Sequence, residues 1–373
     1  MGTIAGVSCK DFSKANPKRN IAKGASVLKQ TTSAGGSAQT MHGLLWCIES
    51  HQPLWVVLEN SDELAEEENA DWHLVLKFLQ SKGYRCSTFI VESTEFAVPA
   101  RRRRAYLVAL AIASRRHSLT NGTFAQFNDR YGRNLNLMRR VPPSILDVLL
   151  PPDAAVVKQA LEDWSSHSAS PLEASTVDGH MSVMRRQCQV VSSYSRIQCR
   201  DSSTASPWFS ALNNRMKEIL SQRQKAHQMN ANIQIVDLSQ TAHRIPTSAP
   251  HPEFNDVIIC TAVLPGSFFW VTFPDPRAGT EGAGLHRNIP HERPLVAEEH
   301  MMLQGWPIAN SPVDISQHPR SVVLSLAGNA FTSSVCLSVF AALIFSVPWN
   351  APDDVLVESA ESADAAFDAI TLL

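Results

Sequence analysis

Apolar residues recur with strand and helix periods through the N-terminal third of the chain. Four apolar runs have the length and composition of buried strands: residues 3–5, 54–60, 84–91 and 104–112. Helical spacing separates them over residues 41–51 and 70–82, and Gly83 is expected to end the second of these helices. Strands that alternate with helices predict a layered α/β domain with a mainly parallel sheet.

The pattern changes at about residue 118. Ser, Asn, Pro and Arg dominate from there with few long periodic runs, and compact elements resume only near residue 255. This texture predicts an irregular module inserted into one α/β domain. We therefore expect four segments: the first part of the α/β domain over 1–117, the inserted module over 118–285, the return to the α/β domain over 286–350, and a tail over 351–373. The tail carries six acidic residues and no basic one, so we expect it to be poorly ordered.

Composition indicates a globular protein. Of 373 residues, 44% are hydrophobic and 18% are charged, which excludes a disordered or fibrous chain. We find no run of about 18 consecutive apolar residues and no signal peptide, and therefore expect no membrane segment and a location inside the cell. The seven cysteines form no C-x-x-C pair, so we predict neither a disulfide framework nor a metal site.

Charge is distributed unevenly along the chain. The formal net charge is only -2, yet residues 101–230 hold 19 basic and nine acidic residues, while the rest of the chain holds 14 basic and 26 acidic residues. A basic middle region suits a polyanion such as nucleic acid, because neutralised phosphates release counterions. A solvated surface with no partner explains the same composition equally well.

Candidate chemistry gathers after the predicted strands. Cys9 follows the first strand and Glu59 ends the second, so both are expected at one edge of the sheet, where α/β proteins place reactive groups. Arg102 and Arg104 are expected on one face at the start of another strand, because alternate residues share a face. A thiol, a carboxyl group and two guanidinium groups suit nucleophilic attack on an electron-poor ring. Taken singly, a cysteine after a strand is usually a core residue, and four consecutive arginines are usually a basic patch.

Five short segments stand in a fixed order: Gly6–Ser13 (GVSCKDFS), Glu59–Ser61 (ENS), Phe96–Arg104 (FAVPARRRR), Arg293–Pro307 (RPLVAEEHMMLQGWP) and Gly328–Phe331 (GNAF). In that order they resemble the motifs G-x-P-C-Q-x-F/Y-S, E-N-V, Y-G-V-P-Q-x-R-x-R, R-x-L-T-x-R-E-x-x-R-L-Q-G-F-P and G-N-S/A-V of the C5-cytosine DNA methyltransferases. Similarity at one motif arises easily by chance, whereas five in sequence are improbable.

The resemblance implies a role for each matching residue. The Cys9 thiolate would add to C6 of a flipped-out cytosine, and C5 would then take the methyl group of S-adenosyl-L-methionine. Glu59 would hold a proton against ring N3, Arg104 would bind the base O2, and Arg102 would brace the catalytic loop or a phosphate. The resemblance implies further contacts with the cofactor by Asn329 and Ala330, and with nucleic acid by Ser13, Arg101, Arg103 and Gln304.

Departures from the family pattern include Ser8, Lys10, Ala100, Glu298 and Met302. A larger departure is that only eight residues precede Cys9, whereas the family places a glycine-rich F-x-G-x-G cofactor loop and two acidic strand ends there. The resemblance therefore implies a partial S-adenosylmethionine-dependent methyltransferase sheet of Rossmann-like type that lacks its first three strands. An incomplete gene product, a split enzyme completed by a separate polypeptide, or a homologue that binds without catalysing would each account for this; we favour the first.

Three functions follow from these observations. The first is a DNA (cytosine-5-)-methyltransferase located in the nucleus or nucleoid, with residues 118–285 as the target-recognition region. The second is the same chemistry on RNA. The third is a catalytically inactive or split homologue that serves as a nucleic-acid-binding or scaffold protein.

Overall fold

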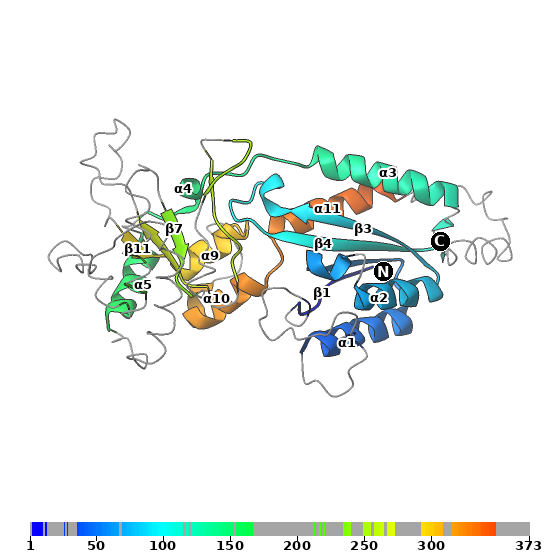
Figure 1. Cartoon of the computed structure of the whole chain (residues 1–373), viewed down its shortest axis with the longest axis horizontal. Helices are drawn as coiled ribbons and strands as arrows, with labels where there is room; N and C mark the ends of the chain where they lie inside the picture. The colour runs from blue at the N-terminus through cyan, green and yellow to red at the C-terminus, as the bar shows by residue number, and fades with distance from the viewer. Residues whose placement is uncertain are drawn as a thin grey trace, which may run out of the picture. The chain divides into compact units, whose positions relative to one another are not determined.

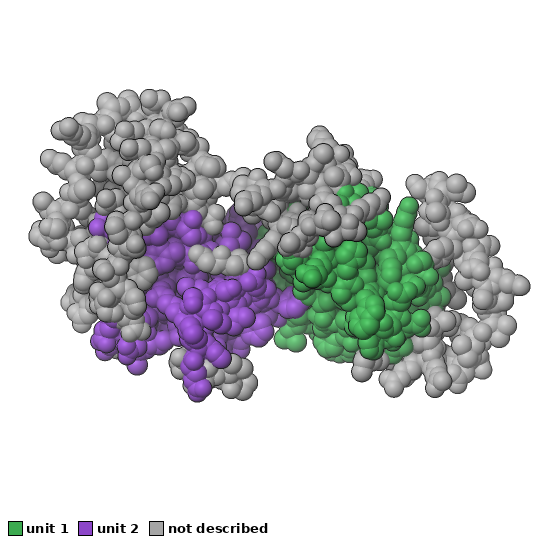
Figure 2. Space-filling model, turned by 90° about the horizontal axis from the view of Figure 1, so that it is seen from below, with its two compact units in different colours: residues 1–96, 103–140, 334–373 green, residues 97–102, 141–333 purple. Residues whose placement is uncertain are grey.

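The computed structural model describes residues 2–9, 12, 26, 28, 36–66, 69–114, 117–118, 121–151, 154–166, 212, 216–217, 220, 234–239, 249–254, 257–264, 267–272, 292–308 and 315–347. The chain divides into two compact units, coloured separately in Figure 2. Unit 1 comprises Met1–Phe96, Arg103–Arg140 and Ser334–Leu373, and unit 2 comprises Ala97–Arg102 and Val141–Ser333. The chain thus passes between the units four times, and two of these passages lie only six residues apart.

Unit 1 is built on a four-stranded sheet with the order β1-β2-β4-β3. Its strands are β1 (Thr3–Gly6), β2 (Trp55–Ser61), β3 (Tyr84–Glu92) and β4 (Arg103–Ala111). β1 and β2 pair in parallel, whereas β4 pairs antiparallel with both β2 and β3. The prediction of a mainly parallel sheet is therefore wrong, because only one of the three strand pairs is parallel.

The connection between β3 and β4 explains this difference. Ten residues join Glu92 to Arg103, and their only helical element is the short 3-10 helix Ser93–Glu95. A parallel pairing needs a crossover of about a dozen residues or more, usually with a helix, so this connection returns the chain as an antiparallel strand. β4 enters the sheet between β2 and β3, and its central residues Ala105–Leu110 are fully buried.

Helices cover both faces of the sheet in unit 1 (Figure 1). On one face, α1 (Gly36–His51) and α2 (Ala70–Ser81) pack on Val56 and Leu58 of β2. On the other face, α3 (Asn121–Leu137) and α11 (Ser333–Ser346) pack on Val57 and on alternate residues of β4. The alternation of side chains along β2 thus supplies both cores of an α/β/α sandwich.

The boundaries of α2 follow from its sequence. Asn69 caps the N-terminus, because its side-chain oxygen accepts the backbone N–H groups of Asp71 at 3.0 Å and Trp72 at 3.3 Å. Gly83 has φ of 78°, a left-handed conformation that favours glycine, and it directly follows the cap residue Lys82. The prediction that Gly83 ends this helix is confirmed.

Unit 2 contains a three-stranded antiparallel sheet with the order β11-β10-β7. Its strands are β7 (Gln234–Asp237), β10 (Phe269–Thr272) and β11 (Glu292–Pro294). The helices among the described residues of unit 2 are α4 (Ile145–Val148), α5 (Ala155–Ser166), α9 (Ala297–Leu303) and α10 (Arg320–Asn329). A core that includes Phe269 and Val271 joins this sheet to α9 and α10. Short elements complete the described residues: the strands β5 (Ala113–Ser114), β6 (His117–Ser118), β8 (Ala249–Pro250) and β9 (Ile258–Ile259), and the 3-10 helices Asp62–Ala65 and Ile315–Gln317.

The pattern of apolar residues misses one long helix. α3 has 17 residues, although the sequence from about residue 118 onward predicts few regular elements. Its aromatic residues Phe127 and Tyr131 are fully buried, and Phe89 of β3 lies against the Tyr131 ring with a centroid distance of 4.4 Å. Asn, Arg and Gly on the remaining positions hide this apolar stripe in the sequence.

One stretch, Arg320–Ser346, has the length and the apolar composition of a membrane span. The structure divides it into α10, with ten residues, and α11, with 14 residues. About 20 helical residues are needed to cross a bilayer, so neither helix alone is long enough. Several apolar residues of α11 belong to the core of unit 1, which accounts for much of its composition.

Candidate active site

The carboxyl ends of β1 and β2 lie side by side. Their parallel register pairs Gly6 with Glu59, and Cys9 follows Gly6 by three residues. Cys9 is a free, half-buried thiol. The structure therefore places Cys9 just beyond β1 and Glu59 near the carboxyl end of β2, so the two residues lie at the same edge of the sheet, as the sequence predicts.

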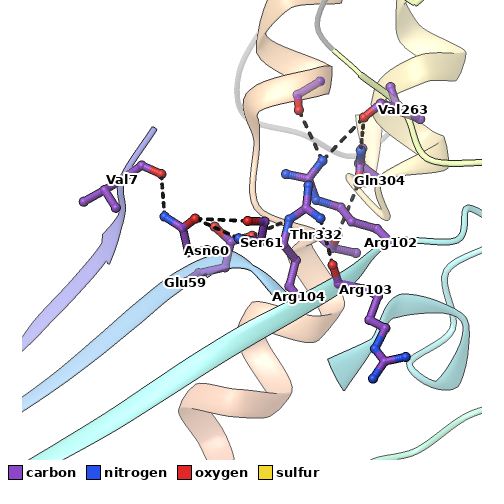
Figure 3. Close-up of polar contacts among 11 residues, drawn as sticks. Val7, Glu59, Asn60, Ser61, Arg102, Arg103, Arg104, Val263, Gln304 and Thr332 are labelled. Carbon is purple, nitrogen blue, oxygen red and sulfur yellow. Dashed lines mark hydrogen bonds and ion pairs between the residues drawn. The ribbon is translucent and has the colours of Figure 1, made fainter. Parts of the chain in front are cut away.

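Polar side chains from β2 and α1 hold the residues that precede Cys9. Asn60 is buried and donates its side-chain amide to the Val7 carbonyl at 3.2 Å, as Figure 3 shows. The backbone N–H of Ser8 donates to Thr40 Oγ1 at 3.2 Å, and Ser37 Oγ donates to Ser8 Oγ at the same distance. None of these side chains has a role predicted from the sequence. The signal for Asn60 is its position directly after Glu59.

Glu59 and Arg104 form an ion pair in unit 1. Arg104 Nε lies 3.1 Å from Glu59 Oε1, and the side chains are 16% and 10% exposed, respectively (Figure 3). The pair forms because the antiparallel register opposes Ser61 to Arg104, so Glu59 and Arg104 come from adjacent strands on the face covered by α11. The partly buried location strengthens their attraction relative to an exposed pair.

The first turn of α11 adds a thiol to this region. Burial raises the pKa of Cys336, and the negative charge of Glu59 raises it further. Cys336 is thus expected to remain a neutral thiol at pH 7, which suits its place beside a carboxylate. The sequence interpretation of Cys336 as a core residue agrees with its partial burial.

Arg102 lies in unit 2 and contacts different groups from Arg104. Its Nη1 lies 3.2 Å from the Gly328 carbonyl and 3.4 Å from the Val263 carbonyl, and the residue is 6% exposed. β4 begins at Arg103, so Arg102 precedes the strand. The prediction that Arg102 and Arg104 share a face of one strand is therefore wrong, because alternation applies only within the strand.

Gln304 is fully buried in the same part of unit 2. Its side-chain amide donates to the Val263 carbonyl at 3.4 Å, and its side-chain oxygen accepts Thr332 Oγ1 at 3.2 Å (Figure 3). Both ends of the side chain therefore meet protein groups. This arrangement favours a bracing role for Gln304 over the direct contact with nucleic acid that the sequence predicts.

The remaining predicted nucleic-acid residues lie on the surface or outside the described residues. Arg101 and Arg103 are exposed, and Arg103 Nε lies 3.3 Å from Asp62 Oδ2 in an exposed ion pair. The backbone N–H of Arg101 donates to the Cys260 carbonyl at 2.8 Å. Ser13 lies outside the described residues.

Asn329 and Ala330 occupy the end of α10 in unit 2. The Asn329 side-chain amide donates to the Ser325 carbonyl at 2.9 Å, and the backbone N–H of Ala330 donates to the Leu326 carbonyl at 2.7 Å. Asn329 is exposed and Ala330 is half-buried. Both residues are thus accessible at a helix end, where the sequence predicts a cofactor contact.

Ala97 adopts an unusual backbone conformation. Its φ is 58°, in the left-handed region that favours glycine. Glycine stands at the corresponding position of the motif Y-G-V-P that the sequence resembles. Ala97 keeps the left-handed backbone conformation of that position, which is strained for alanine. Ala97 is also the first residue of unit 2.

Comparison with known proteins supports one family. The model of the C-5 cytosine-specific DNA methylase family matches residues 2–344. The DNA (cytosine-5-)-methyltransferase DMT5 of Cryptococcus neoformans is 32% identical over 111 residues, which amount to 30% of this chain and 4% of that relative. Among solved structures, Dnmt2 methyltransferase of S. pombe (15% identity, TM-score 0.41) and the methyltransferase EhMeth of Entamoeba histolytica (10% identity, TM-score 0.42) align with 92% of this chain and 77% of each of theirs. The family match extends over most of the chain, from the strand before Cys9 into the last turn of α11, and the chain therefore belongs to the C-5 cytosine-specific DNA methylase family.

Proposed function

We propose that this chain performs the base-attacking chemistry of a DNA (cytosine-5-)-methyltransferase, with DNA as substrate and S-adenosyl-L-methionine as methyl donor. The observation that supports this most directly is the Glu59–Arg104 ion pair at the sheet edge where Cys9 also lies. A nucleophile, a carboxyl group and a guanidinium group from three strands meet the needs of attack on a cytosine ring.

Each residue has a defined task in this reaction. The Cys9 thiolate adds to C6 of an extruded cytosine and forms a C–S bond. Glu59 carries a proton in this step; it passes the proton to N3 and becomes the carboxylate that pairs with Arg104. Arg104 orients Glu59 and binds the base O2 as electron density builds up on the ring. C5 then carries the nucleophilic electron pair. Once C5 has been methylated, the C5 proton passes to a base or water and the C–S bond breaks. The Cys9 thiolate leaves, N3 returns its proton to the Glu59 carboxylate, and the aromatic ring is restored.

The described residues fit one wall of a methyl-donor site. Asn329 and Ala330 lie at an accessible helix end, and the Asn329 side chain offers an amide oxygen in addition to the N–H that binds Ser325. When bound, S-adenosyl-L-methionine supplies an electrophilic methyl group. In unit 2, Arg102 holds the Gly328 carbonyl and so supports the backbone from which Asn329 extends.

The outer edge of β1, in unit 1, can accept further strands. Among the described strands β1 pairs only with β2, and Ile4 on β1 is 38% exposed. An unpaired strand edge with apolar side chains tends to accept another strand. We infer that further strands, carried by a separate polypeptide or another segment, pair with β1 and complete the cofactor-binding half. The nucleus or nucleoid is the location that this substrate implies.

A covalent trap tests the proposal. The chain is incubated with S-adenosyl-L-methionine and DNA that contains 5-fluorocytosine, with and without a polypeptide that supplies the cofactor-binding half of a related enzyme. Fluorine at C5 blocks the final proton loss, so the Cys9 adduct should persist and shift the protein on a denaturing gel. RNA with the same base distinguishes the two nucleic acids.

Matched cysteine variants make the result specific. Cys9→Ser should abolish the adduct, whereas Cys47→Ser should leave it unchanged, because Cys47 is an equally free, half-buried thiol on α1. Glu59→Gln should slow adduct formation by about 10²- to 10⁴-fold, the usual contribution of a general acid. Absence of a Cys9-dependent adduct under every condition would refute the catalytic proposal and leave a binding or scaffold function.

A further inference from the structure

The C-terminal end of α9 forms a Schellman motif that fixes the position of Trp306. The Trp306 backbone N–H donates to the Met301 carbonyl at 3.2 Å, and the Gly305 N–H donates to the Met302 carbonyl at 2.9 Å. Gly305 has φ of 77°, which this motif requires and glycine provides without strain. The direction in which Trp306 leaves the helix is therefore set by the backbone.

The Trp306 side chain contacts the segment that follows α10. Its indole Nε1 donates to the Phe331 carbonyl at 3.1 Å, while the residue as a whole is 37% exposed. The Phe331 carbonyl belongs to the short connection between α10 and α11, directly after Asn329 and Ala330. One side-chain hydrogen bond thus links the end of α9 to the backbone of Phe331, the residue that follows Ala330.

Other hydrogen bonds tie the same two segments together. The Ser333 N–H donates to the Gln304 carbonyl at 3.0 Å, and Ser333 Oγ donates to the Gly305 carbonyl. Thr332 Oγ1 donates to the Gln304 side chain at 3.2 Å. We name residues 304–306 the α9 turn and residues 328–333 the interhelix loop. We call the hydrogen bonds between these two segments the clamp. All their residues belong to unit 2, so the clamp lies within one compact unit.

We infer that Trp306 is a positioning residue: by holding the Phe331 carbonyl it fixes the interhelix loop in the shape that presents Asn329 and Ala330 to the methyl donor. The inference rests on the proposed function for the contact with the donor, but the clamp itself does not. The other clamp bonds join the α9 turn to Thr332 and Ser333, which follow Phe331 in the chain. Trp306 is the clamp residue that acts on the part of the loop nearest to Ala330.

Trp306→Phe removes the indole N–H and keeps an aromatic ring. We expect hydrogen exchange of the Ala330 and Ser333 backbone amides to become about two- to fivefold faster, the range for loss of one partly exposed hydrogen bond. Exchange within α10, at Val323–Ala327, should not change. The KM for S-adenosyl-L-methionine should rise by a similar factor, with kcat preserved, because a loosened loop weakens donor binding rather than the attack by Cys9.

Trp46→Phe is the matched control. Trp46 lies on α1 in unit 1, is 66% exposed and contacts the His51 ring edge-on, so its substitution should alter neither readout. Unchanged exchange at Ala330 and Ser333 in Trp306→Phe, or equally faster exchange throughout α10, would overturn the positioning role. Faster local exchange with an unchanged KM would overturn the link to the donor.

The exchange measurement separates this inference from the proposed function. It needs no substrate, so it decides the clamp even if the wild-type chain forms no Cys9 adduct. If no Cys9 adduct forms but Trp306→Phe still speeds hydrogen exchange at Ala330 and Ser333, only the catalytic proposal is refuted.

Discussion

A buried ion pair in unit 2 gives the largest stability effect that we expect from a single substitution. Arg293 Nη1 donates to Glu299 Oε2 at 2.8 Å and Arg293 Nη2 donates to Glu299 Oε1 at 2.7 Å, and the two side chains are 1% and 0% exposed. Glu299 also accepts the backbone N–H groups of Leu150 and Val296, each at 2.9 Å. The pair thus joins β11, the first turn of α9 and the chain near Leu150.

Glu299→Gln keeps the size of the side chain but removes its charge. One carboxylate oxygen becomes an amide NH2 group, which cannot accept from the Arg293 guanidinium or from the backbone N–H that the oxygen bound. Arg293 then remains a buried cation without a counter-charge. Breaking a buried pair in this way typically costs about 3–5 kcal/mol, and we expect the free energy of unfolding to fall by that amount.

Urea unfolding of the wild type and two variants tests this reasoning. Glu298→Gln makes the same chemical change one position earlier in α9, at a half-buried residue. Burial raises the pKa of Glu298, so its charge is itself unfavourable, and the control should be neutral within about 0.5 kcal/mol or slightly stabilising. A loss below about 1 kcal/mol for Glu299→Gln, similar to that of the control, would show that the buried pair does not hold these segments together.

Two further substitutions have predictable signs. Ala97→Gly should relieve about 1–2 kcal/mol of left-handed strain in the folded state. Glycine also stabilises the unfolded chain by about 0.5–1 kcal/mol through its greater freedom, so the net effect should be a modest rise in Tm. A lower Tm would contradict the assigned strain. Burial lowers the pKa of His300, so below about pH 6.5 the unfolded state binds a proton that the folded state does not. Stability should therefore fall as pH decreases from 7 to 5, by up to about 1.4 kcal/mol per pH unit. In His300→Gln the urea midpoint should depend less on pH across that range than in the wild type. An equal pH dependence of the midpoint in both proteins would exclude His300 as the cause.

Local features of the sequence predict β2, β3, β4 and α2 of unit 1 well. Apolar runs locate β2, β3 and β4 to within one residue at each end, and Gly83 ends α2 because its backbone conformation is a local property. The starts of elements without apolar residues are harder to predict. α1 begins at Gly36, five residues before the helical pattern becomes visible, because its first residues are small and polar.

Strand direction and side-chain burial depend on distant parts of the chain. The antiparallel direction of β4 follows from the length of the connection before it, a signal that was present in the sequence and that outweighs the general preference of alternating strands and helices for parallel sheets. The burial of Gln304 depends on Val263 and Thr332, which are 41 and 28 residues away, and no periodic pattern relates these positions.

The arginine run shows why a contiguous motif does not specify a contiguous site. The boundary between the two units falls after Arg102, so Arg102 belongs to unit 2 and Arg104 to unit 1. Arg104 pairs with the Glu59 carboxylate, whereas Arg102 donates to the backbone carbonyls of Val263 and Gly328. An ion pair in a partly buried place orients the paired side chains, while a charge that meets carbonyls fixes backbone shape. The two arginines therefore serve different purposes in the same motif: Arg104 acts on the proposed proton donor, and Arg102 acts on the loop that carries Asn329.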